Sequence, residues 1–497
     1  MVGSGESVSY RELDERSNQG AHLFRSLGLR RGMCIAILLE NSARFFEIVW
    51  AAQRAGLYYT CISTSFTVQE ICYQVADSGA TVLMVSAAKS SIQDTLSRQL
   101  NDLKVMVVGS QIETEMSFEL ARAKMPIVPI ADESPGTDML YSSGTTGKPK
   151  GIQSALPDGS IAERTRLVRL GEELYGMDLN TVFLSPAPLY HSAPLRWCMT
   201  VHRLGGTTVV MEKFDAEAAL ASIERFSITH AQWVPTHFVR LLKLPEETRL
   251  RYRYASLKVV FHAAAPCPMT VKQSMIDWWG PIVHEYYAGT EFNGFTAIDS
   301  IEWLKHRGSV GKAVLGKLYV CDEQGEPVPS PQQGLVYFAN GGQFSYHNDE
   351  AKTVAAKNRY GWTTLGDIGW LDEGDYLYLT DRKSFMIITG GVNVYPQEVE
   401  NLFVTHPQVV DVAVFGVPDE DMGEKVVAVV QPVDAALCGP GFAASLREWA
   451  AAQLSPIKMP RIIDFMNELP RHPNGKLYKK ALQETYSAKF LEQKRQK

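Results

Sequence analysis

The chain has 497 residues, too many for one hydrophobic core, so we expect at least two folding units. Hydrophobic residues make up 45% and charged residues 21%, values typical of a globular protein, and the formal net charge is −6. This charge lacks the basic surplus of nucleic-acid-binding proteins, and no apolar run is long enough for a membrane span. The start lacks the features of a signal peptide. The seven cysteines are scattered without a C-x-x-C pair, which favours free thiols in the cytoplasm.

The first half of the chain alternates predicted helices and strands. Capping boxes at residues 9–12 and 67–70 each open a helix. Apolar runs predict strands at 33–39, 57–62, 81–85, 181–184, 228–234 and 257–263, with helices at 42–55 and 216–225. Such alternation is typical of the α/β class, in which crossover connections produce a parallel sheet covered on both faces.

Two other patterns follow. Residues 308–342 contain short strand-like pieces interrupted by prolines, which predicts a small antiparallel or barrel-like unit. From residue 384 onward we expect a helix from 396, strands at 409–414 and 425–431, a helix from 442, and a basic, solvated tail after 484. We therefore predict an N-terminal domain at 1–382, with the barrel-like unit at about 308–382, and a small α/β domain at 383–497.

Residues 141–151 read Tyr-Ser-Ser-Gly-Thr-Thr-Gly-Lys-Pro-Lys-Gly. Glycines let backbone N–H groups approach an anion closely, and hydroxyl and ammonium groups supply further donors. A P-loop requires four residues between its glycines and Ser or Thr after its lysine. Here two residues separate Gly144 from Gly147, and Pro149 follows Lys148. The segment therefore predicts a phosphate-binding loop of another kind.

Further motifs follow in a fixed order, and each would be ordinary structure if it stood alone. They are Pro-Ala-Pro-Leu-Tyr-His at 186–191, Tyr-Tyr-Ala-Gly-Thr-Glu at 286–291, acidic and basic residues within 361–367 and 376–384, Gly-Gly-Val-Asn at 390–393, and a Pro/Gly-bounded lysine within 471–476. Together with the phosphate-binding segment, they make residues 9–482 closely similar to the AMP-forming acyl-CoA synthetases. These belong to the adenylate-forming superfamily, which also contains peptide-synthetase adenylation domains and luciferases.

The resemblance implies the fold and the reaction. The family fold has a large N-terminal part, with two α/β subdomains and a small β-barrel, and a mobile α/β C-terminal domain. The implied enzyme is a carboxylic acid–CoA ligase that uses ATP and Mg²⁺ to form an acyl-adenylate. It then transfers the acyl group to coenzyme A.

The resemblance also implies roles for single residues. The ATP- and AMP-binding set is Ser142, Ser143, Gly144, Thr145, Thr146, Gly147, Lys148, Lys150, Ala264, Tyr287, Ala288, Gly289, Thr290, Asp367 and Arg382. Within this set, Tyr287 would stack on adenine, Thr290 would contact the α-phosphate, and Asp367 and Arg382 would contact the ribose. The catalytic set is Lys476, His191, Thr290 and Glu291, with Glu291 also the Mg²⁺ ligand. Gly390, Gly391 and Val392 would form the thioester-forming loop, and Ser384 the hinge.

Three features depart from the family pattern. Ser384, preceded by Lys383, stands where the family usually has Asp or Lys, which leaves the hinge behaviour open. Residues 152–157 replace a usual Thr-His. The chain also begins almost at its first capped helix, where relatives have more sequence, and this could leave one side of the acyl site open.

Other functions remain to be distinguished. A stand-alone enzyme that loads an acyl or amino-acid group onto a carrier has the same framework, although residues 190–194 supply no carboxylate for a substrate ammonium group. A luciferase-like enzyme also shares it. A non-catalytic binding protein would be expected to lack Lys476 or Glu291, and both are present. A homodimer also remains open.

The identity of the acid is less constrained by the sequence. An apolar acyl pocket is predicted at His191, Trp197, Trp233, Phe238 and Ala263, with His262 nearby, and it suits a fatty, aryl or steroid-like acid. Aromatic residues at such spacing are equally typical of a hydrophobic core.

Overall fold

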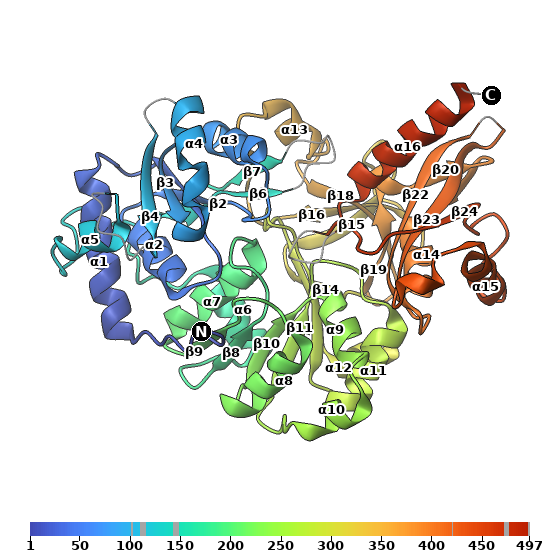
Figure 1. Ribbon diagram of the computed structural model, residues 1–497, viewed down its shortest axis with the longest axis horizontal. Coiled ribbons are helices and arrows are strands. Elements are labelled where there is room, and N and C mark those ends of the chain that lie inside the picture. The colour runs from blue at the N-terminus through green and yellow to red at the C-terminus, as the bar shows by residue number, and fades with distance from the viewer. Residues whose placement is uncertain (101–102, 110–115, 143–148, 420, 472–476, 496–497) are drawn as a thin grey trace.

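The computed structural model describes residues 1–100, 103–109, 116–142, 149–419, 421–471 and 477–495. The first unit, blue to cyan in Figure 1, is a parallel five-stranded sheet in the order β4-β3-β1-β2-β5. Its strands are β1 (Cys34–Leu38), β2 (Tyr58–Cys61), β3 (Ala80–Ser86), β4 (Lys104–Val108) and β5 (Thr137–Asp138). Its helices are α1 (Tyr10–Ser26), α2 (Ala43–Arg54), α3 (Val68–Asp77), η1 (Ala87–Ile92), α4 (Gln93–Gln99) and α5 (Phe118–Ala123). Both predicted capping boxes are confirmed, at Ser9 and Glu12 and at Thr67 and Glu70.

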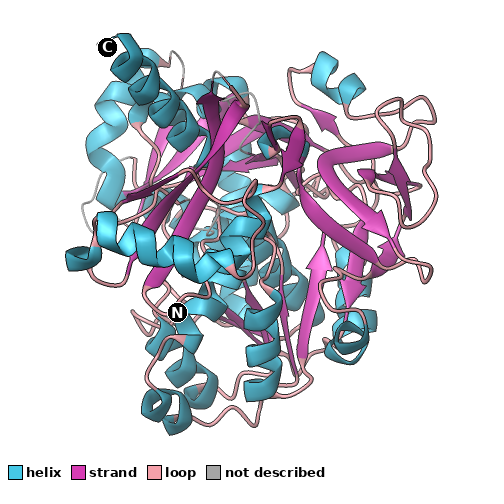
Figure 2. Ribbon diagram, turned by 90° about the vertical axis from the view of Figure 1, so that its right-hand side faces the viewer, coloured by secondary structure: helices cyan, strands magenta, loops and turns pink. Residues whose placement is uncertain are grey.

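The second unit, green to yellow in Figure 1, is a seven-stranded sheet in the order β14-β13-β12-β11-β10-β8-β9. Its strands are β8 (Val182–Ser185), β9 (Thr207–Val210), β10 (His230–Trp233), β11 (Val259–His262), β12 (Val283–Tyr287), β13 (Phe295–Ile298) and β14 (Lys312–Leu315). Its helices are α6 (Arg166–Tyr175), α7 (Ser192–Leu204), α8 (Ala216–Arg225), α9 (Pro235–Leu242), α10 (Glu246–Arg251), α11 (Met269–Trp279) and α12 (Ser300–Lys305). Helices flank the strands of both units (Figure 1), and Figure 2, seen from the side of the C-terminal domain, shows helices and strands side by side in the part nearest the viewer.

The expected parallel pairing is confirmed for β8 to β12, but one edge of this second unit departs from it. Strands β13 and β14 run antiparallel to their neighbours. Only residues 288–294 separate β12 from β13, too few for the crossover that a parallel pair requires. Strand β14 lies within the range expected for the barrel-like unit, yet it extends this sheet instead.

Two smaller sheets lie between the α/β units and the C-terminal domain (Figure 1). One is antiparallel, in the order β15 (Lys317–Cys321), β16 (Gly334–Ala339), β18 (Thr363–Leu371) and β19 (Leu377–Arg382). The other joins distant segments, in the order β17 (Ser345–Tyr346), β7 (Lys150–Gln153) and β6 (Leu140–Ser142), with α13 (Glu350–Ala355) beside it. The second sheet therefore brings residues near 345 to the strands that flank the predicted phosphate loop.

The C-terminal domain, orange to red in Figure 1, follows the short helix η2 (Lys383–Phe385). Its sheet has the order β21-β20-β23-β22, with β24 also paired to β23. Its elements are β20 (Ile387–Thr389), β21 (Val392–Val394), α14 (Pro396–Phe403), β22 (Val409–Asp419), β23 (Gly423–Pro432), η3 (Ala435–Leu437), α15 (Pro440–Ala451), β24 (Ile462–Phe465) and α16 (Lys479–Arg495). It has its own hydrophobic core, centred on β22, β23 and α15. The α/β fold, with a large N-terminal part and a small C-terminal domain, is confirmed.

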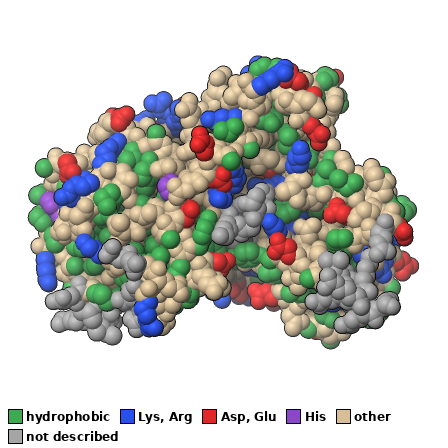
Figure 3. Space-filling model, turned by 90° about the horizontal axis from the view of Figure 1, so that it is seen from above, with side chains coloured by type: hydrophobic (Ala, Val, Ile, Leu, Met, Phe, Trp, Pro, Cys, Tyr) green, Lys and Arg blue, Asp and Glu red, His purple; other side chains and the backbone are tan. Residues whose placement is uncertain are grey.

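Other expectations from composition concern thiols, charge and membranes. All seven cysteines are free thiols. On the face drawn in Figure 3, acidic and basic side chains are scattered among hydrophobic and neutral ones. Within the part of the chain that the structure describes, no helix is both long enough and apolar enough to cross a membrane.

Candidate active site

Three predicted nucleotide-binding residues are in direct contact. The Tyr287 hydroxyl, at the end of β12, donates a hydrogen bond to Asp367 Oδ2 at 2.6 Å, and Arg382 Nε donates to Asp367 Oδ1 at 3.1 Å. Asp367 and Arg382 face each other across β18 and β19. Burial and the Asp367 carboxylate raise the pKa of Tyr287, and the same carboxylate raises the pKa of Arg382. The β18–β19 hairpin therefore holds the Asp367 carboxylate between the Tyr287 hydroxyl and the Arg382 guanidinium.

Glu291 lies just beyond Tyr287 and is buried. Its Oε1 accepts a hydrogen bond of 3.0 Å from the hydroxyl of Tyr346, on β17. The Lys352 ammonium lies 4.0 Å from the centre of the Tyr346 ring, where a cation is attracted to the ring face. Partial burial lowers the pKa of Lys352, and the Glu291 carboxylate opposes that shift. This arrangement combines a carboxylate with a nearby cation, as a site for metal-bound phosphates would.

The strands next to the predicted phosphate loop are antiparallel neighbours. Strand β6 pairs with β7, and Ser142 lies opposite Lys150. Lys150 Nζ forms an ion pair of 3.0 Å with Asp349 Oδ2, which raises the pKa of Lys150. The remaining loop residues, 143–148, lie outside the described residues. Of the two flanking strands, β7 pairs with β17, which carries Tyr346, and β6 pairs with the other edge of β7.

The backbone at two site positions has specific steric requirements. Ala264, just after β11, is exposed and has a φ of 75°, a conformation that is costly for a residue with a Cβ. A Cβ at Gly289 would lie 2.6 Å from Leu365 Cδ1 and 2.7 Å from Glu291 Oε2. Glycine at 289 therefore lets the segment that carries Thr290 and Glu291 pass close to β18.

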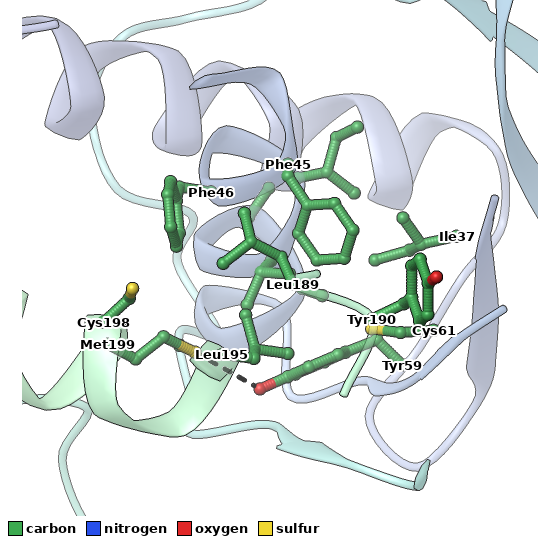
Figure 4. Packing of buried hydrophobic residues seen from close by; sticks show 14 of the residues in the cluster. Ile37, Phe45, Phe46, Tyr59, Cys61, Leu189, Tyr190, Leu195, Cys198 and Met199 are labelled. Carbon is green, nitrogen blue, oxygen red and sulfur yellow. Dashed lines mark hydrogen bonds between the residues drawn. The ribbon is translucent and has the colours of Figure 1, made fainter. Parts of the chain in front are cut away.

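His191 immediately precedes α7, at the junction of the two α/β units. Figure 4 shows its neighbours Leu189, Tyr190 and Leu195 packed among side chains of the first unit, including Phe45 and Ile37. The next residue, Ser192, has its Oγ 3.1 Å from Thr290 Oγ1. The hydrophobic anchor on both sides of His191 thus fixes the start of α7 against the 287–291 segment.

Only some of the predicted acyl-pocket residues lie together. A cavity of about 40 Å³ lies between α7 and the segment 286–295, and Trp197 lines it. Trp233 and Phe238 do not line this cavity; they are almost fully buried in a second hydrophobic cluster, around α9 and α11. Ala263 is buried in the cluster that contains Trp197. A role for Trp233 and Phe238 in acid binding stays a prediction.

The predicted residues of the second half-reaction lie in the C-terminal domain. Gly390 and Gly391 form the tight turn between β20 and β21, with φ values of 56° and 75°, and Val392 follows on β21. Both glycines have the positive φ that a two-residue hairpin turn of this kind requires. Ser384 is exposed within η2, between the last strand of the barrel-like unit and β20. Lys476 lies outside the described residues.

Several site residues carried no signal in the sequence. Tyr346 is 55 residues from Glu291, and Ser192 is 98 residues from Thr290. Arg196 pairs through two nitrogens with Asp138, at 2.7 and 3.1 Å. Each contact depends on the packing of separate units, so spacing along the chain could not have revealed it.

The oxygen chemistry of the site is compatible with Mg²⁺. Among the described residues, no group of three or more His, Cys, Asp or Glu side chains gathers as a metal site. Mg²⁺ is commonly held by one or two carboxylates together with substrate phosphate oxygens. A buried carboxylate such as Glu291, which is hydrogen-bonded to Tyr346 on the strand paired with β7, suits that type of site.

Comparison with known proteins identifies the family. Residues 1–345 match the family described as AMP-binding enzyme, and residues 398–476 match the AMP-binding enzyme C-terminal domain. The chain belongs to this family. It is an adenylate-forming ligase of the acyl-CoA synthetase family, related to AMP-forming acid–CoA ligases over its whole length.

Relatives of the family differ in the acids they are named for. A feruloyl-CoA synthase from Amycolatopsis is 28% identical over 484 residues, covering 96% of this chain and 93% of that protein. The long-chain-fatty-acid–CoA ligase FadD13 from Mycobacterium tuberculosis is 28% identical over 500 residues, covering 97% and 93%. At equal identity, these two relatives do not select one acid for this chain.

Solved structures of one protein, MatB, are also similar to this chain over nearly its whole length. ATP-bound MatB from Rhodopseudomonas palustris superposes with a TM-score of 0.82 at 27% identity, covering 98% of this chain and 95% of that chain. Apo MatB gives 0.70 at the same identity and coverage. The chain as a whole therefore superposes better on the ATP-bound MatB structure than on the apo structure.

Proposed function

We propose that the protein is a carboxylic acid–CoA ligase in which ATP and an acid meet at residues 287–291. One observation carries this proposal: a single short segment contacts both halves of the site. Tyr287 bonds to the Asp367–Arg382 pair on one side, and Thr290 lies against Ser192, next to His191, on the other. A ligase that joins a nucleotide to an acid requires such a shared boundary.

The nucleotide half would hold ATP through its separate parts. Tyr287 and the exposed backbone at Ala264 would contact the base, and Asp367 with Arg382 would bind the ribose hydroxyls. Ser142, Lys150 and the loop between them would hold the β- and γ-phosphates, with Ala288, Gly289 and Thr290 at the α-phosphate. Glu291 would be a ligand of Mg²⁺, which when bound would neutralise charge on the phosphate oxygens.

The first step would join the acid to AMP. The substrate carboxylate, next to His191, would attack the α-phosphorus in line, and pyrophosphate would leave. Negative charge grows on oxygen during this step, and fixed donors and cations lower its energy. Thr290 and Lys476 would supply this stabilisation.

The second step would produce the thioester. The thiol of coenzyme A would attack the acyl carbonyl carbon. AMP would leave with the oxygen atom that came from the substrate carboxylate. Rotation of the C-terminal domain about Ser384 would remove Lys476 and bring in the turn at Gly390 and Gly391. The seven cysteines are free thiols, which suits a reducing compartment, and we propose the cytoplasm as the location of the protein.

Acid-dependent exchange of pyrophosphate into ATP tests this proposal. We expect exchange that requires Mg²⁺ and a carboxylic acid but no coenzyme A, and a thioester only after coenzyme A is added. Thioester on a carrier protein but not on coenzyme A would identify a carrier-loading enzyme instead. Absence of exchange with every class of acid would overturn the proposal.

A further inference from the structure

The cavity beside Trp197 starts where the acid is proposed to react. Its walls include Ala288 and Gly289, immediately before Thr290, and Ser192 and Ala193, immediately after His191. Trp197, one helical turn beyond Ala193 on α7, and Tyr286, two residues before Ala288, also line it. An acid whose carboxylate lies at Thr290 would therefore direct its tail toward these two aromatic rings.

The inner end of the cavity is closed by a hydrogen-bonded aromatic wall. Trp197 Nε1 donates to the Tyr286 hydroxyl oxygen at 3.2 Å, and Gln232 Nε2 donates to the same oxygen at 3.3 Å. Trp197 is 1% exposed and Tyr286 6%. Tyr286 stacks on Phe295 with ring centres 4.7 Å apart, and Trp197 lies 4.9 Å from Phe261. Moving either ring would break hydrogen bonds and tight packing together.

The volume of the cavity is small compared with the size of the acids for which some relatives are named. The cavity measures about 40 Å³, whereas a cavity that binds benzene measures about 150 Å³. The outer side chains Leu167 and Phe292 are only half-buried, so they can move outward on binding. The site can therefore widen at its mouth to take one ring, but its inner end sets a limit on length.

Charge limits the acid as well. Arg196 lines the cavity, but its guanidinium pairs with Asp138 and also donates to the Thr290 carbonyl oxygen at 2.9 Å. This pairing leaves no uncompensated positive charge to bind a second carboxylate. The remaining walls are largely apolar, which favours an uncharged tail.

We propose that the acyl site takes a compact monocarboxylic acid, with one ring or a short branched chain, and that the Trp197–Tyr286 wall excludes long chains. This inference rests on the proposed ligase function. It makes Trp197 and Tyr286 specificity-determining residues. The sequence left fatty, aryl and steroid-like acids open as substrates. The wall excludes long-chain fatty acids and steroid-like acids from these.

The first test compares acids of graded length in the exchange assay. Benzoate, isovalerate, octanoate, dodecanoate and succinate serve as probes, and the matching acyl-sulfamoyl adenosines give binding constants independent of turnover. One extra or missing methylene group in an apolar pocket changes the ratio of kcat/KM between two substrates by about 10-fold or more. We expect the exchange rate with benzoate or isovalerate to exceed that with dodecanoate by at least about 100-fold, and the rate with succinate to be low.

A preference for dodecanoate would overturn the size limit and keep the ligase function. No exchange and no binding with any probe would overturn both.

The second test removes the wall. Trp197→Ala should raise activity with octanoate and dodecanoate relative to benzoate by at least about 10-fold, without changing KM for ATP. Trp303→Ala is the matched control, because Trp303 is also 1% exposed but packs in the other hydrophobic cluster. Tyr286→Phe removes the hydroxyl without a large cavity and should shift the preference in the same direction. An unchanged length profile in both Trp197→Ala and Tyr286→Phe would contradict the proposal.

Discussion

Asp367 joins two residues that lie far from each other in the chain, Tyr287 and Arg382. Asp367→Asn removes the charge that pairs with Arg382 and weakens the acceptor for Tyr287. Hydrogen bonds to charged groups contribute about 1.5–3 kcal/mol, so KM for ATP should rise roughly 10- to 100-fold. Asp372→Asn is the matched control, since this carboxylate lies on the same hairpin but faces His306. Equal effects of the two substitutions would argue against a specific role for Asp367.

His237, on α9, provides a test by pH. Burial, together with the nearby Arg240, lowers the pKa of His237 to about 3, and its ring stacks on Phe214 at 4.0 Å. Because this pKa is depressed in the folded state, its contribution to stability is complete above pH 6.5 and is lost as the pH falls toward 3. Urea unfolding at about pH 4.5 should show wild type to have lost about 2–3 kcal/mol at this site. Between pH 7 and pH 4.5, the free energy of unfolding of His237→Phe should fall by about 2–3 kcal/mol less than that of wild type. The same pH dependence in both proteins would contradict this prediction.

Residue-scale predictions succeeded where the relevant chemistry is local. Ser9 with Glu12, and Thr67 with Glu70, form capping boxes because both partners lie within one helical turn. The contacts among Tyr287, Asp367 and Arg382 join three residues that the family resemblance assigned to the nucleotide, and that role stays a prediction. Tyr346 could not be assigned to Glu291, since only the pairing of β17 with β7 brings that hydroxyl into the site.

A buried ion pair joins α11 to β12, the strand that leads into the active-site segment. Lys272 Nζ lies 2.6 Å from Glu285 Oε2, and the Lys272 side chain is 0% exposed. Burial raises the pKa of Glu285 despite the attraction of Lys272. Glu285 is also two residues before Tyr287. The pair therefore fixes the position of α11 beneath the start of the 287–291 segment.

Removing only one partner should be costly. Lys272→Met leaves Glu285 buried without its cation and should lower the free energy of unfolding by about 3–5 kcal/mol. The double variant Lys272→Met and Glu285→Leu should recover most of that loss, because neither charge then remains. Urea unfolding of the two single variants and the double variant measures the coupling. Additive losses would show that the pair does not act as a unit.

Element-scale prediction was accurate for isolated helices and strands and less so for their pairing. The strands β1, β2, β3, β8, β10 and β11 fall within the expected ranges or within a residue of them. Antiparallel β13 and β14 were missed because an apolar run does not specify its partner. Strand β14 also shows that a Pro-rich composition does not mark where one sheet ends and another begins.

At the scale of the whole molecule, polar contacts join described residues of the C-terminal domain to the larger part. Tyr395 donates to Gln333 Oε1 at 3.1 Å, and Lys243 Nζ donates to the Val409 carbonyl oxygen. The connection runs through η2, which contains Ser384. A short exposed connection suits rotation of one domain against the other.

Ser384→Pro tests the position of the hinge. Proline fixes φ and removes an N–H donor, so the connection should rotate less readily. We expect thioester formation to slow by about 10-fold or more while acid-dependent exchange is largely retained. Ser384→Ala controls for loss of the hydroxyl and should preserve both activities. Equal losses in both half-reactions of Ser384→Pro would move the hinge elsewhere.

The two-domain architecture could be predicted because the motifs of the family occur in order along nearly the whole chain. The relative placement of the domains could not, since it depends on contacts between distant segments, such as that of the Lys243 side chain with the Val409 carbonyl oxygen. The substrate lay outside sequence reasoning for the same reason: the Trp197–Tyr286 wall forms only when α7 packs against β12.

Transfer of oxygen from the acid tests the central claim most directly. A carboxylic acid labelled with ¹⁸O in both carboxyl oxygens is incubated with the protein, ATP, Mg²⁺ and coenzyme A, and the products are analysed by mass spectrometry. If the carboxylate attacks the α-phosphorus and the thiol then displaces AMP, each AMP should carry one labelled oxygen and pyrophosphate none. Formation of ADP with label in inorganic phosphate, or of thioester with unlabelled AMP, would contradict the account.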